Sequence, residues 1–129
     1  MIIYSLIDYL EEKEIGVVNE TIFVGQLPFD KSNIISVMYS PSADSNPSLN
    51  VYEQTVDIYG RFTDSQVGYQ KMLDIFNLFR AYKNYEIDGF HIYFSLPLGA
   101  VNDNDRDVKS RKLYSLSTRF RYRLLTEVS

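Results

Sequence analysis

The segment LYSLSTRFRYRLL, residues 113–125, alternates between two kinds of side chain. One set is mostly apolar or aromatic: Tyr114, Leu116, Thr118, Phe120, Tyr122 and Leu124. The other set is polar: Ser115, Ser117, Arg119, Arg121 and Arg123. Because successive side chains of a strand point to opposite faces, the segment predicts a long strand with one face against a core. Its other face then presents three arginines in a row, which we call the arginine row (Arg119, Arg121 and Arg123).

Four further segments read as strands. VYEQTVDIYGRF (51–62) alternates over a comparable length and predicts a second half-buried strand. GFHIYFSL (89–96) predicts an apolar, aromatic strand, and TIFVGQLP (21–28) and NIISVMYS (33–40) predict two shorter strands.

Two segments have helical periodicity. Residues 2–14 place Ile3, Leu6, Ile7 and Leu10 at helical spacing. A second helix is expected to start at a capping box of Thr63 and Gln66 and to run to about Lys83, or about 20 residues. The element order predicts an α+β fold, in which a mainly antiparallel sheet is packed by one long helix and a shorter N-terminal helix.

Two polar segments, SPSADSNPSLN (40–50) and PLGAVNDNDRDVKSRK (97–112), are expected to be mobile loops. The chain shows no internal repeat and no linker, so residues 1–129 are expected to form a single domain.

The composition fits a globular protein, with 45% hydrophobic and 23% charged residues. The 11 Tyr and 8 Phe are many for this length, and such a surplus favours contact surfaces beyond the core. The absence of Cys excludes disulfides and thiol chemistry. We expect no signal peptide and no membrane span, because the N-terminal stretch lacks a basic region and no apolar run approaches about 20 residues.

The formal net charge of −4 hides an uneven distribution. Residues 1–105 contain 6 Lys and Arg against 15 Asp and Glu, a net charge of −9, whereas residues 106–129 contain 7 against 2, a net charge of +5. An acidic body with a basic final strand favours head-to-tail contacts between copies about as much as it favours an anionic ligand.

The sequence gives little support for an enzyme, a metal site or a cofactor. The single histidine, His91, stands in a strand without an adjacent catalytic partner, so a structural role is expected. Asp103, Asp105 and Asp107 have the spacing of a calcium loop, but Val108 stands where such a loop needs Gly and Tyr114 where it needs Glu. Glycine spacing matches no nucleotide-binding motif.

The arginine row is therefore the main candidate for function, and three interpretations remain open for it: a solvated face, a protein–protein contact or charged lining of an assembly, and a nucleic-acid surface. A nucleic-acid platform combines cations and stacking aromatics on one face, whereas Phe120 and Tyr122 are expected on the opposite face. The partner contacts we expect are Arg111, Arg119, Arg121, Arg123, Asp103 and Asp105, with Lys109 and Lys112 extending the patch.

The layout of the whole chain resembles a known family. It combines IFVGQLP, VMYSPS, TVDIYGRF, a capped helix leading to LFRAYKNYEIDGF, the strand exit FSLPLGAVNDNDRD and the closing LYSLSTRFRYR. Over residues 2–124 this layout is similar to the minor capsid or tail terminator (tail completion) proteins of long-tailed bacteriophages. The chain departs from the family pattern at residues 100–106, where an Asp followed by Gly-Arg is expected.

The resemblance implies a structural virion protein that forms a ring, usually a homohexamer, at the head-proximal end of the tail. Such a ring caps the tail tube and joins it to the head connector. The implied partners are further copies of the chain, the tail tube protein and the head–tail connector, with DNA passing through the channel without specific binding. Assembly in the host cytoplasm is expected. A head–tail connector or adaptor subunit is the nearest alternative, and a small nucleic-acid-binding protein is the alternative of another class.

Overall fold

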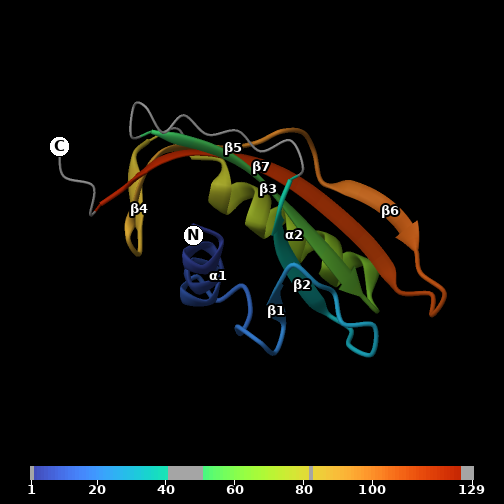
Figure 1. The fold of residues 1–129 in the computed structure, drawn as a ribbon. Helices are drawn as coiled ribbons and strands as arrows, with labels where there is room; N and C mark the ends of the chain where they lie inside the picture. Colours follow the sequence, from blue (N-terminus) through green and yellow to red (C-terminus); the bar gives the residue numbers. More distant parts are fainter. Residues whose placement is uncertain (1, 41–50, 82, 126–129) are drawn as a thin grey trace.

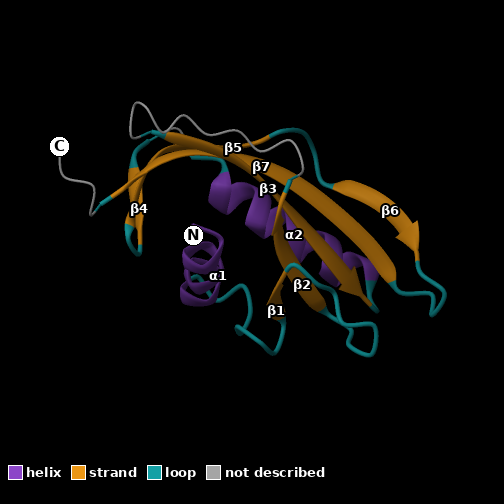
Figure 2. Cartoon of the chain, in the orientation of Figure 1, coloured by secondary structure: helices purple, strands orange, loops and turns teal. Residues whose placement is uncertain are grey.

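The computed structural model describes residues 2–40, 51–81 and 83–125. They form two helices and seven strands (Figures 1 and 2). The elements are α1 (Ile2–Glu12), β1 (Ile22–Val24), β2 (Ile34–Tyr39), β3 (Tyr52–Phe62), α2 (Ser65–Phe79), β4 (Tyr85–Ile87), β5 (Phe90–Pro97), β6 (Asn102–Arg106) and β7 (Lys112–Leu124).

The strands form one sheet in the order β1-β2-β3-β7-β5-β4. All neighbouring pairs are antiparallel except β1 and β2, which are parallel. Strand β7 pairs with β3 along one side and with β6 and β5 in turn along the other. The sheet arches over α1 and α2, so both helices cover its inner face (Figure 1). The predicted α+β class, with a mainly antiparallel sheet, is confirmed.

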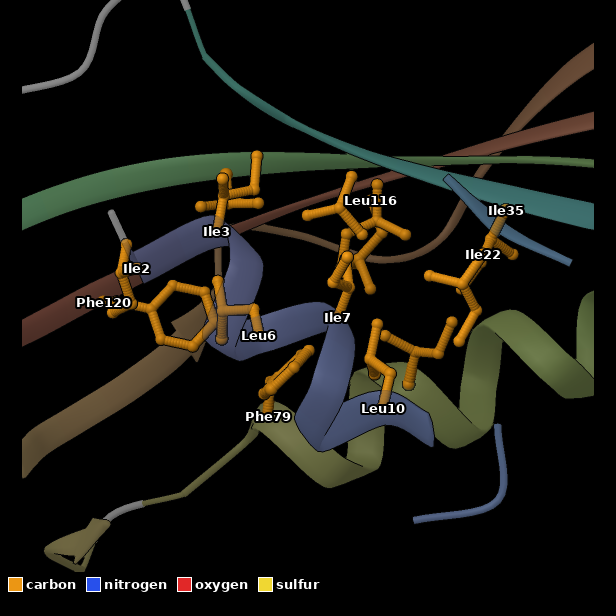
Figure 3. Close-up of a cluster of buried hydrophobic side chains, with 14 of the residues drawn as sticks. Ile2, Ile3, Leu6, Ile7, Leu10, Ile22, Ile35, Phe79, Leu116 and Phe120 are labelled. Atoms are coloured by element: carbon orange, nitrogen blue, oxygen red, sulfur yellow. The ribbon is translucent and has the colours of Figure 1, made fainter. Parts of the chain in front are cut away.

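The core lies between the inner face of the sheet and the two helices. The predicted apolar positions of α1, Ile3, Leu6, Ile7 and Leu10, are all buried, and Figure 3 shows them in one cluster with side chains of α2 and β7. The rings of Phe79 and Phe120 meet edge to face, with their centroids 5.1 Å apart. Burying each large apolar side chain contributes about 1.5–3 kcal/mol, so this cluster fixes which face of β7 points inward.

The predicted long helix is wrong in length. Helix α2 has 15 residues and ends at Phe79, rather than running about 20 residues to Lys83. The helix ends because the residues at and after its C-terminus bind β5. Ser95 Oγ donates to the carbonyl of Phe79 at 2.6 Å, and the backbone of Ala81 pairs with that of Ser95. The N-cap is Asp64 and not the predicted Thr63, since the Asp64 carboxylate accepts from the backbone N–H groups of Gln66 and Val67.

The predicted polar loop 97–112 contains strand β6. Its five side chains are all exposed, and its backbone pairs with Lys112–Ser115 at one end of β7. The short strand β4 is also absent from the sequence-based prediction. Residues 41–50, which make up most of the predicted loop 40–50, lie outside the described residues. No helix in the described part of the chain is long and apolar enough to cross a membrane.

Candidate functional site

The arginine row lies on the outer face of β7, away from the helices. Arg119 and Arg121 are exposed and Arg123 is half-buried, whereas Thr118, Phe120 and Tyr122 between them are buried. The predicted division of β7 into a core face and an outer arginine face is therefore confirmed.

The arginine row makes few polar contacts with the rest of the described chain. Arg121 Nη1 lies 3.6 Å from Glu53 Oε1 on β3, and both side chains are well exposed to solvent. Among the residues that the structure describes, Arg119 and Arg123 have no ion pair or side-chain hydrogen bond. Exposed ion pairs of this kind contribute about 0–1 kcal/mol to the free energy of unfolding. The stability of the fold therefore does not explain why three cations stand on this face.

Strand β5 supplies apolar and aromatic neighbours to the row. Leu96, Phe94 and His91 stand directly opposite Arg119, Arg121 and Arg123 in the β5–β7 pairing. Paired residues share a face of the sheet, so the outer face mixes cations with aromatic rings. The expectation that Phe120 and Tyr122 lie on the opposite face is confirmed. The aromatic neighbours on β5 were not predicted, because strand pairing is not visible in the sequence.

His91 lies on this outer face. Its Nδ1 is 3.7 Å from Glu86 Oε1 on β4, and its ring meets that of Tyr93 edge to face, with centroids 4.9 Å apart. The histidine thus has a carboxylate and an aromatic ring as neighbours.

Arg111 is placed differently from the arginine row. That it contacts a partner stays a prediction, and within the chain only 5% of the residue is exposed. Its guanidinium binds Asp107 Oδ2 through Nε at 2.9 Å and Nη2 at 2.8 Å. It also donates to the carbonyls of Phe29 and Lys31 at 2.9 and 3.0 Å. These bonds fasten the segment between β1 and β2 to the β6–β7 turn.

A second buried arginine joins this network. Arg61, 6% exposed, donates from Nη2 to the carbonyls of Pro28 and Lys31, the latter at 3.0 Å, and its Nε lies 3.9 Å from Asp107 Oδ2. Burial, and next the charge of Arg111, lower the pKa of Arg61. We call Arg61 and Arg111 the buried pair, and Asp107 is the aspartate that they share.

The three aspartates that have the spacing of a calcium loop have different surroundings. Asp103 is exposed and pairs with Lys112, and a hydrogen bond from that lysine lowers the pKa of the Asp103 carboxyl. Asp107 faces Arg111, and Asp105 is exposed. Within residues 2–40, 51–81 and 83–125, no group of three or more acidic, histidine or cysteine side chains could hold a metal ion.

Two exposed apolar side chains near the buried pair were not predicted from the sequence. Phe29 is 55% exposed and Val108 is 88% exposed. Lys109 Nζ lies 4.6 Å from the centre of the Phe29 ring. No periodic pattern marks Phe29, and its position depends on contacts with residues about 80 positions later in the chain.

A search of curated proteins found no match. The family described as "Bacteriophage tail terminator protein" matches over residues 9–124, which is most of the chain. The family is one of structural phage tail proteins, in line with the non-enzymatic function and the virion location expected from the sequence. The chain belongs to the bacteriophage tail terminator family.

Proposed function

We propose that the chain assembles into a closed ring, with six copies as the resemblance implies, at the head-proximal end of a phage tail. The ring caps the tail tube, stops its growth and presents a surface to the head connector. Assembly takes place in the host cytoplasm, and DNA passes through the channel without specific binding.

The observation that carries this proposal is the arginine row. Three cations on an outer sheet face, two of them without a side-chain partner among the described residues, are not needed by the fold. Their apolar neighbours Leu96 and Phe94 give the same face contact area of the kind that protein interfaces use. Family membership supports a partner within the tail.

The test is light scattering of the purified chain, alone and with the purified tail tube protein. We expect a discrete species of several chain masses, or binding that ends tube growth at a fixed length. A chain that stays monomeric and leaves tube growth unchanged would refute the proposal.

A nucleic-acid surface is the second candidate, and the aromatic residues beside the row favour it more than the sequence did. Guanidinium groups opposite Phe94 and His91 have the chemistry of a single-strand platform. That function requires affinity that falls steeply with salt, with one unit of slope lost for each phosphate contact removed. Binding of labelled oligonucleotides at low salt separates this candidate from the ring.

A further inference from the structure

We propose that the arginine row of one copy docks into a groove beside helix α1 of the next copy. This inference rests on the proposed ring and names the two surfaces that would hold it together. The groove has a volume of about 310 Å³ and lies between α1 and residues 18–26. Its lining includes Tyr4, Asp8, Phe23 and Val24.

The lining has the chemistry that an arginine side chain requires. Asp8 is exposed and makes no hydrogen bond or ion pair with any residue that the structure describes. Tyr4, one turn earlier on α1, is 55% exposed and offers an aromatic face. The alkyl stem of an arginine packs on apolar side chains such as Phe23 and Val24, while its guanidinium pairs with a carboxylate and stacks on a ring.

The charges around the groove complement the row. Residues 2–20 contain Asp8, Glu11, Glu12, Glu14 and Glu20 against the single Lys13, a net charge of −4. Asp8 and Glu12, both exposed, are four residues apart on α1, a rise of about 6 Å. Neighbouring arginines of the row are about 6.6 Å apart along β7, so two of them can face both carboxylates together.

The positions of the two surfaces require a second copy. The row lies on the outer face of the sheet, and α1 lies under the inner face (Figure 1). A chain therefore cannot place its own row in its own groove. Contact between two unlike surfaces of identical chains is heterologous, and it closes into a ring or continues as a filament.

Charge reversal with mixing tests the docking. Asp8→Arg and Arg121→Asp are each expected to raise the concentration for half-assembly at least about tenfold, because each brings like charges together. An equimolar mixture should regain assembly, since the unaltered row of the first variant meets the unaltered groove of the second. This recovery also shows that both variants are folded. Asp88→Arg, a matched reversal in the turn between β4 and β5, should leave assembly unchanged.

Each other outcome overturns the docking. If the unaltered chain assembles and the two variants assemble equally well, the groove is not the contact, while the proposed ring stands. If the unaltered chain assembles neither alone nor with tube protein, both proposals fail. If Arg121→Asp abolishes binding to a labelled DNA oligonucleotide, and Asp8→Arg affects neither DNA binding nor assembly, the row serves nucleic acid instead.

Discussion

Two groups of arginines on one sheet have opposite surroundings. Arg61 and Arg111 are buried at one end of the sheet, where they share Asp107 and bind carbonyls of the segment between β1 and β2. The arginine row lies on the outer face of β7, where the one ion pair that it makes with the described residues is exposed. The buried pair contributes to folding, whereas the row is free to contribute to assembly. Arginine content alone does not distinguish these two roles.

The largest effect is expected from removing a buried guanidinium. Arg111→Ala leaves the carbonyl of Phe29 without its donor and removes the closest ion-pair partner of Asp107, and the free energy of unfolding should fall by about 3 kcal/mol. Arg111→Lys keeps the charge but loses the planar fork, so an intermediate loss is expected. Urea denaturation measures both. Equal stability of all three proteins would show that the network does not hold the fold.

Acid should weaken the same network. Burial tends to raise the pKa of Asp107, but hydrogen bonds from Arg111 and from the backbone of Lys109 outweigh it and hold the pKa below its ordinary value. Because the folded pKa is lowered, the stabilisation is present above the unfolded value near 3.9 and is lost as pH falls through the folded value.

The measurement is urea denaturation between pH 6 and pH 2 for the unaltered chain and for Asp107→Asn. The variant should be less stable at pH 6 and should lose less stability on acidification. Parallel curves for the two proteins would mean that Asp107 is not the group that titrates.

The smallest effect on stability is expected from the row. Arg121→Ala removes an exposed pair at 3.6 Å and should change the free energy of unfolding by less than about 0.5 kcal/mol. Urea midpoints of Arg119→Ala and Arg121→Ala should coincide with that of the unaltered chain. A loss as large as that of Arg111→Ala would remove the distinction between the two groups.

The alternation of side chains in β7 predicted which arginines face outward, because a period of two leaves one choice once Phe120 and Leu116 are buried. The same reasoning does not extend to Arg111, which stands just after the β6–β7 turn and is held by residues about 80 positions away. Turn geometry of this kind depends on tertiary contacts.

Two other features depend on strand pairing. The sequence NDNDR has little strand propensity, so β6 follows from the unpaired edge that β7 offers. The aromatic residues beside the row become visible only when β5 is known to lie next to β7. The groove beside α1 likewise joins residues 4–8 with residues 18–26, which no local pattern connects.

The most direct test is sedimentation velocity on the triple variant Arg119→Ala, Arg121→Ala and Arg123→Ala, with urea denaturation of the same samples. We expect an unchanged unfolding midpoint together with loss of the assembled species that the unaltered chain forms alone or on tail tube protein. An assembled species of unchanged mass and amount in the triple variant would contradict this expectation.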